Sequence, residues 1–130
     1  MTELFVYGSA DCDQFVVSII DKNTGEPKEI LESKIPRIIP FEHKIYRVAC
    51  GGQHTLLLTT FGKVFSFGCD DDGQLGQIGR KDVKVPRELD TLTSPMTDIS
   101  AGDAHSVAVN THTNEVYYWG TYRVSIYINY

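Results

Sequence analysis

Residues 48–68 read VACGGQHTLLLTTFGKVFSFG, and residues 99–120 read ISAGDAHSVAVNTHTNEVYYWG. Each stretch has a Gly-x-x-His-[Ser/Thr] start, an alternating apolar segment, a polar turn and an aromatic-Gly ending. Matching residues lie 51 or 52 positions apart: Gly51 and Gly102, His54 and His105, Gly68 and Gly120. The drift of one residue falls in the turn, where one copy has TTFGK and the other NTHTNE. Such a repeat indicates stacked copies of one structural unit.

The residues between these markers indicate strands. HTLLLTT and HSVAVN alternate, and KVFSF and EVYYW are rich in β-branched and aromatic residues. A turn containing Gly62 or Asn114 joins each pair of strands into a hairpin. Segments 45–50 and 96–101 are predicted to add a shorter strand before each hairpin. The proline in Val85–Pro86 suits an edge strand. A period near 51 with about four strands per unit is typical of a propeller blade. We therefore predict an all-β fold, an incomplete β-propeller of two to three blades, each an antiparallel four-stranded sheet.

The start of the chain resembles the end of an earlier unit. LFVYG at residues 4–8 aligns with VFSFG at 64–68. Their final glycines, Gly8 and Gly68, are 60 residues apart, whereas Gly68 and Gly120 of the later copies are 52 apart. The extra residues fall within 15–35 and predict a hairpin that turns at 23–25, with arms FVVSII and EILES. A projecting binding element and a longer blade connection both fit this insertion.

These patterns divide the chain into four segments. Residues 1–35 are predicted to hold the end of a preceding blade plus the hairpin, 36–95 a complete repeat, 96–123 a partial repeat and 124–130 a divergent tail. Arg-Val-Ser at the start of the tail can be encoded by AGG-GTA-AGT, the usual start of an intron. Translation of an unspliced intron and a divergent terminal strand are both open interpretations.

Composition excludes several classes of protein. The chain has 130 residues, 42% of them hydrophobic and 22% charged, with a net charge of -5. These are globular values, and the acidic balance argues against a general nucleic-acid binder. No apolar run approaches the roughly 18 residues of a membrane span. We therefore expect no membrane contact. The three cysteines at unrelated spacings imply no disulfide framework, which favours a location in the nucleus or cytoplasm.

Single motifs suggest chemistries that the repeat argues against. Cys50-x-x-x-His54 offers zinc ligands, but Ala101 replaces the cysteine in the second copy. GQLG lacks the Gly-Lys-[Ser/Thr] ending of a phosphate loop. A calcium loop with its sixth position at Gly73 would have glycines where positions one and twelve need acidic ligands. We therefore predict no metal, no cofactor and no catalytic residue, and a protein that is not an enzyme.

The recurrent residues are predicted to shape the scaffold. A histidine at the start of an inner strand can tie neighbouring backbone groups together with both ring nitrogens, and glycines suit crowded strand ends and positive φ. The predicted structural residues are Gly51, His54, Gly68, Gly73, Gly76, Gly102, His105 and Gly120. The acidic loop is predicted to form turns and a charged rim, a candidate protein-binding patch of Asp70, Asp71, Asp72 and Gln74.

The combined pattern of Cys-Gly-x-x-His-Thr, aromatic-Gly and Asp-Gly-Gln-Leu-Gly resembles the regulator of chromosome condensation repeat family. The resemblance covers residues 36–120 well and 4–15 more weakly. It implies a seven-bladed propeller that serves as an interaction platform, and the founding type of the family binds chromatin and promotes nucleotide exchange on the Ran GTPase. A ring of this period needs about 360 residues, so we predict marginal stability, or self-association through open blade edges, for this chain alone.

Two functions follow from the resemblance. The first is a non-enzymatic scaffold that presents blade loops to a protein partner. The second is a fragment of a guanine-nucleotide exchange factor for a Ran-type small GTPase, which would work by binding the nucleotide-free GTPase more tightly than the loaded one. Chromatin contact is expected only through missing blades, because no basic tail is present here. A fragment with no activity of its own is a third hypothesis.

Overall fold

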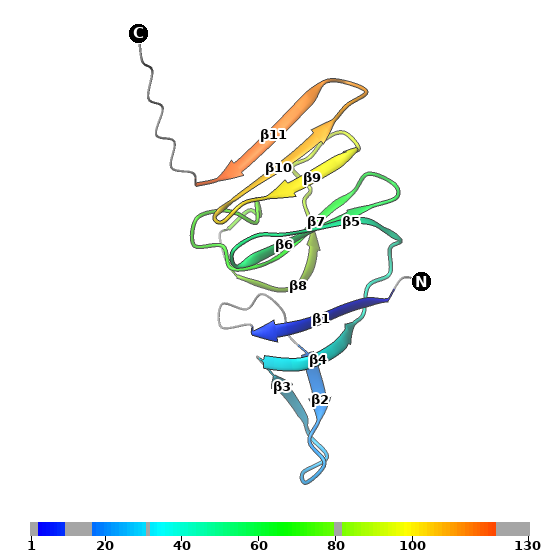
Figure 1. Ribbon diagram of the computed structural model, residues 1–130, viewed down its shortest axis with the longest axis vertical. Helices are drawn as coiled ribbons and strands as arrows, with labels where there is room; N and C mark the ends of the chain where they lie inside the picture. The colour runs from blue at the N-terminus through cyan, green and yellow to red at the C-terminus, as the bar shows by residue number, and fades with distance from the viewer. Residues whose placement is uncertain (1–2, 10–16, 31, 80–81, 122–130) are drawn as a thin grey trace.

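The computed structural model describes residues 3–9, 17–30, 32–79 and 82–121. Strands, turns and loops make up these residues, and no helix capable of crossing a membrane occurs among them. The sheets follow one another along the long axis of the molecule (Figure 1). The strands are β1 Leu4–Ser9, β2 Val17–Ile20, β3 Pro27–Ile30, β4 Glu32–Ile39, β5 Ile45–Cys50, β6 His54–Thr59, β7 Val64–Gly68, β8 Val83–Glu88, β9 Asp98–Ala101, β10 His105–Asn110 and β11 Glu115–Gly120. The all-β prediction is confirmed.

Strands β5 to β8 form the middle blade, an antiparallel sheet of four strands in the order β5-β6-β7-β8. The predicted hairpin pairs β6 with β7 and places His54 opposite Gly68. Strand β8, which contains Pro86, lies at an edge of the sheet. An edge strand has a partner on one side only, so it tolerates a proline whose nitrogen faces away from that partner. The predicted four-stranded unit is therefore confirmed.

Strands β9 to β11 form the C-terminal blade, a sheet in the order β11-β10-β9. His105 pairs with Gly120, which repeats the pairing of the middle blade. The hairpin turns also match, because Gly62 has a φ of 79° and Asn114 a φ of 59°. Asparagine tolerates the left-handed region better than most non-glycine residues. The two blades thus repeat each other strand by strand.

Strands β1 and β4 form the N-terminal blade, a two-stranded antiparallel sheet. Gly8 in β1 and Gly68 in β7 both have a φ of 116°, so β1 is the counterpart of β7, and β4, which follows it in the sheet, is the counterpart of β8. These two strands lie in the segment where the sequence predicts the end of a preceding blade. The expected boundary at residue 36 falls inside β4, so the sequence unit begins within the last strand of the preceding blade.

The predicted hairpin between residues 15 and 35 is present as β2 and β3. Val17 pairs with Ile30, and the Asp21 carboxylate accepts a hydrogen bond of 2.8 Å from the Asn23 N–H in the turn. The second arm was expected at 29–33 but spans Pro27–Ile30, because the following residues form β4 and pair with β1 instead. Residues 15 and 16 of the first arm, Cys12 and the tail at 124–130 lie outside the described residues.

The middle blade is covered on both faces, because successive side chains of a strand point to opposite sides of the sheet. Leu57 of β6 packs toward the N-terminal blade, whereas Leu56 and Leu58 pack toward the C-terminal blade. The first core contains Leu4, Ile39, Phe41, Leu57, Phe65 and Phe67. The second contains Leu56, Leu58, Val64, Leu89, Met96, Ile99 and Ala108. These two cores hold the three blades together.

Candidate functional site

His54 connects the middle blade to the C-terminal blade. Its ring packs over Gly51, which has no Cβ to obstruct it, and its Nε2 lies 2.8 Å from Ser106 Oγ. Ser106 Oγ donates its hydrogen to the Gln74 carbonyl over 2.7 Å. The hydroxyl has a single hydrogen, so it accepts from Nε2–H, and neutral His54 carries its proton on Nε2.

This arrangement differs from the predicted role of the histidine. Nε2 of His54 bonds a side-chain hydroxyl of the next blade instead of a backbone group, and Nδ1 has no hydrogen-bond partner within the described part of the chain. Burial, followed by the charge of His105, lowers the pKa of His54. The ring is therefore neutral near pH 7 and acts as a donor between blades. Cys50, which forms the rejected zinc motif with His54, is exposed.

His105 has the same local backbone geometry as His54, but no described blade packs against its ring. The Gly102 N–H donates to the His105 carbonyl over 2.9 Å, just as Gly51 donates to His54 over 2.8 Å in the middle blade. The His105 ring lies over Gly102 and near the ring of Tyr118, with centroids 5.9 Å apart. His105 is only half-buried, since no blade covers its outer face within the described residues.

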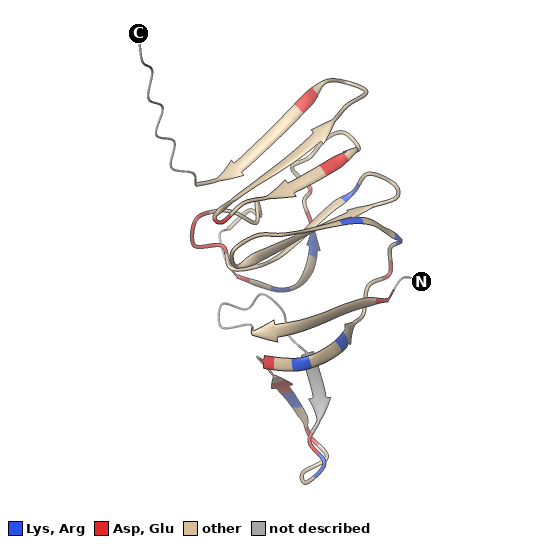
Figure 2. Ribbon diagram, viewed as in Figure 1, with Lys and Arg blue, Asp and Glu red and all other residues tan. Residues whose placement is uncertain are grey.

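The loop after β7 is anchored by side chains that the sequence assigned to its rim. Asp70 is 3% exposed, and its carboxylate accepts from the Leu75 N–H over 3.0 Å. Gln74 is 2% exposed, and its Oε1 accepts from the Asp72 N–H over 2.9 Å. Asp71 and Asp72 are exposed, and the acidic loop stands out beside the middle blade in Figure 2. The candidate rim is therefore reduced to Asp71 and Asp72, because Asp70 and Gln74 face inward.

The same loop joins the middle and C-terminal blades. The Gln74 carbonyl accepts from Trp119 Nε1 over 2.8 Å in addition to Ser106. Gly73 and Gly76 have φ values of 75° and 67°, which favour glycine, and a Cβ on Gly76 would meet the Trp119 indole. The GQLG core therefore acts as a joint between blades.

Cys69, Asp71 and Asp82 form a cluster that sequence reasoning missed. One potential ligand atom from each lies within 4.8 Å of the others, and Asp82 also accepts from the Asp70 N–H over 2.8 Å. Burial raises the pKa of the Cys69 thiol, which therefore keeps its proton near neutral pH. No spacing rule identifies this set, because Cys69 and Asp82 meet only when the loop folds back on itself.

Comparison with known protein families matches the middle blade and the C-terminal blade as far as β10. Residues 62–109 and residues 45–74 each match the family described as the regulator of chromosome condensation (RCC1) repeat. With the repeated blades above, these matches define the class: the chain belongs to the regulator of chromosome condensation repeat family, and its fold is an incomplete β-propeller.

Individual relatives match most of this chain but little of their own length. The regulator of chromosome condensation of Mus musculus is 35% identical over 101 residues, 76% of this chain and 24% of that protein. The E3 ubiquitin-protein ligase HERC2 of Homo sapiens is 45% identical over 74 residues, 56% of this chain and 2% of that protein. The crystal structure of Prp20p of Saccharomyces cerevisiae, described with its binding properties to Gsp1p and histones, is 25% identical and covers 91% of this chain and 29% of its own, with a TM-score of 0.67. The chain thus spans about a quarter of the length of the mouse regulator.

Proposed function

We propose that this chain is part of a non-enzymatic propeller scaffold that presents the loop after β7 to a protein partner. The anchoring of that loop carries the proposal. Asp70 and Gln74 use buried polar groups to fix the loop backbone, so Asp71 and Asp72 extend from a base that is already ordered. A preordered loop loses less conformational entropy on binding, which favours recognition.

The exposed part of this loop indicates the chemistry of the partner. It combines the carboxylates of Asp71 and Asp72 with Ile78, which is 84% exposed. Carboxylates complement lysine and arginine side chains. An exposed apolar side chain can be buried against an apolar surface of the partner. The partner is therefore a protein with a basic patch beside an apolar one, in the nucleus or cytoplasm. The binding of Gsp1p and histones by the relative Prp20p supports a protein partner for this chain.

Site-specific photocrosslinking tests this proposal. A photoreactive amino acid at position 72 should give a discrete protein adduct in cells, and the same residue at His112, an exposed position in the turn after β10, should not. Asp71→Lys should weaken binding of the identified partner by about tenfold, because like charges then meet across the interface. Equal adducts from both positions, or binding unchanged by Asp71→Lys, would contradict the loop as the binding site.

A second candidate is a share in guanine-nucleotide exchange on a Ran-type GTPase. The β2–β3 hairpin favours it, because it projects from the N-terminal end of the molecule (Figure 1), and Glu29 braces it to Lys84 of β8 over 3.4 Å. Release of labelled GDP from such a GTPase separates the two candidates. Faster release on addition of the chain supports exchange, whereas unchanged release with a crosslink at position 72 supports the scaffold alone.

A further inference from the structure

Ser94 stands directly before Pro95 in the loop that joins β8 of the middle blade to β9 of the C-terminal blade. The chain has five prolines, and Pro95 is the only one that follows a serine or threonine. Residues 91, 93 and 95 of this loop are exposed, and Ser94 is half-buried. A Ser-Pro pair is the sequence that proline-directed protein kinases recognise, and an irregular surface loop is where an enzyme can reach it.

The Ser94 hydroxyl ties this loop to the C-terminal blade. Its Oγ donates to Glu115 Oε2, at the start of β11, over 2.8 Å. Thr113 Oγ1 donates to the same oxygen over 2.6 Å, and the Tyr117 hydroxyl donates to Oε1 over 3.4 Å. Hydrogen bonds from Thr113 and then Ser94 lower the pKa of Glu115, so this carboxylate is charged at neutral pH. Ser94 therefore lies against a negative charge.

The surroundings of Ser94 offer little positive charge to balance a second anion. Ser94 and Lys63 line the same hollow, of about 250 Å³, beside the β6–β7 turn. Lys63 is the only lysine or arginine among the described residues that line it. Its Nζ lies 2.7 Å from one carboxylate oxygen of Glu88 and 2.9 Å from the other. The charge of Lys63 is therefore already balanced, and a phosphate on Ser94 would face Glu115.

The loop is also held by the middle blade. Pro95 packs on Gly62, where a Cβ would lie 2.5 Å from the Pro95 Cβ, and the Met96 N–H donates to the Gly62 carbonyl over 2.8 Å. Leu92 packs against the apolar core between the middle and C-terminal blades. Displacement of Ser94 from β11 would therefore draw Leu92 away from this core, whereas Met96 keeps its anchor on the middle blade.

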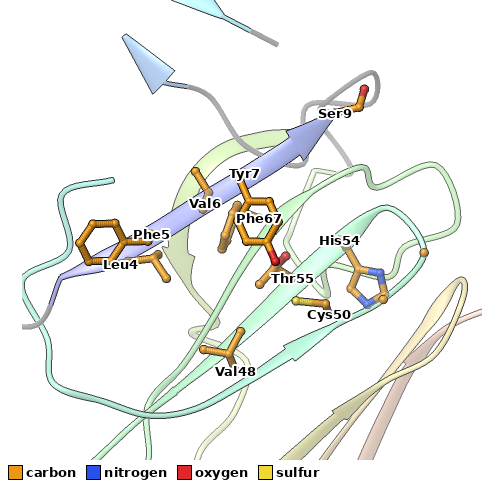
Figure 3. A pocket seen from close by; sticks show the side chains of 12 residues that line it. Leu4, Phe5, Val6, Tyr7, Ser9, Val48, Cys50, His54, Thr55 and Phe67 are labelled. Carbon is orange, nitrogen blue, oxygen red and sulfur yellow. The ribbon is translucent and has the colours of Figure 1, made fainter. Parts of the chain in front are cut away.

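The hydroxyl side chains of a larger hollow lack the sequence feature of Ser94. That hollow, of about 470 Å³, lies between β1 and the β5–β6 turn, and Ser9 and Thr55 line it (Figure 3). Alanine follows Ser9 and leucine follows Thr55. Neither hydroxyl belongs to a Ser-Pro or Thr-Pro pair, so Ser94 is the candidate.

We propose that Ser94 is a phosphorylation site for a proline-directed protein kinase, and that its phosphate separates the loop from β11. The kinase transfers the γ-phosphoryl group of ATP to Ser94 Oγ, its catalytic base takes the hydroxyl proton, and ADP leaves. The phosphate carries a charge of about −1.5 to −2 near neutral pH, and the ester oxygen has no hydrogen left to donate to Glu115. Attraction at this contact becomes repulsion, and the loop moves outward.

The site is separate from the proposed partner-binding loop. Pro95 packs on Gly62, which precedes β7, whereas the acidic loop follows β7. The two sites therefore lie at opposite ends of one strand, and either proposal can fail without the other.

Kinase treatment of the folded chain tests the site itself. Incubation with a mitogen-activated protein kinase, ATP and Mg²⁺ should add a single phosphate, which peptide mass spectrometry should place on Ser94. Ser94→Ala should abolish incorporation, and Pro95→Ala should reduce it by about tenfold or more, because the enzyme's pocket discriminates the following residue. A synthetic peptide of residues 88–100 should also be modified. An unmodified peptide, a modified peptide beside an unmodified folded chain, or phosphate on another residue would overturn the site.

Amide hydrogen exchange tests the consequence of the phosphate. Phosphorylation should speed exchange of the Leu92 N–H by about 3- to 10-fold, the effect of losing one hydrogen bond that holds the loop. Ser94→Glu should act in the same direction, and Thr93→Glu, at the exposed neighbouring position, should not. In Glu115→Gln the phosphate should have a smaller effect, because the opposing charge is gone. Unchanged exchange after phosphorylation, an equal increase in Glu115→Gln, or an equal effect of Thr93→Glu would contradict the release of the loop.

Discussion

His54 and His105 stand at the same position in consecutive blades, 51 residues apart, and their local backbones are alike. Each ring lies over the glycine three residues before it, and each carbonyl accepts from that glycine's N–H. Yet His54 is 1% exposed and bonded to the next blade, whereas His105 is half-buried and lies beside Tyr118. The difference comes from the neighbour, because only the middle blade has a described blade on each face.

This contrast shows how energy is distributed in a repeat protein. Hairpin, turn and glycine contact are fixed within a unit, since they depend on residues close in sequence. Burial is fixed between units, since the apolar faces are covered only by adjacent blades. The same residue type should therefore contribute more stability in the middle blade than in the C-terminal one.

The largest difference is expected between Leu56→Ala and Val107→Ala, which occupy equivalent positions. Leu56 is fully buried between blades, so its truncation should lower the free energy of unfolding by about 2–5 kcal/mol. Val107 is half-buried on the outer face, so its truncation should cost about 1 kcal/mol or less. Urea unfolding measures both, and equal losses would mean that the outer face is covered in solution, for example by self-association.

A smaller difference is expected between Gly51→Ala and Gly102→Ala. The new Cβ would meet the histidine ring in both cases, but at Gly51 it also meets the Gly102 carbonyl of the next blade. The buried His54 ring cannot move away, whereas the His105 ring can. We expect a loss of about 2–3 kcal/mol for Gly51→Ala and about 1 kcal/mol for Gly102→Ala. A larger loss of thermal stability for Gly102→Ala than for Gly51→Ala would contradict the claim that the His54 ring is held more tightly than the His105 ring.

The smallest effect is expected from proton binding at His54. Burial, then the charge of His105, lowers its pKa below the ordinary 6.5, so the unfolded chain takes up the proton at a higher pH than the folded chain does. Stability from this group is complete above pH 6.5 and falls as the pH drops through the lowered folded pKa. The difference between the urea midpoints at about pH 7.5 and about pH 5.5 should therefore be smaller in His54→Gln than in the unchanged chain. Parallel pH dependences in the two proteins would exclude His54 as the titrating group.

Sequence reasoning predicted features that depend on neighbouring residues. The paired hairpins, the turns at Gly62 and Asn114, and the edge strand with Pro86 all follow from local alternation and turn chemistry. It failed where the chain folds back on itself. Asp70 and Gln74 look like surface residues in an acidic, polar run, but their side chains satisfy backbone N–H groups inside the loop.

By itself, the sequence determined the repeat, the strand order within each unit and the family to which the chain belongs, because period, alternation and glycine positions are properties of consecutive residues. Only the tertiary structure decided which copy of each repeated residue is buried. It placed Ser106 against His54, brought Cys69 to Asp82 and left the edge of β1 unpaired among the described residues. The physical reason is that a side chain loses contact with water through the elements packed against it, and those elements lie far away in the chain.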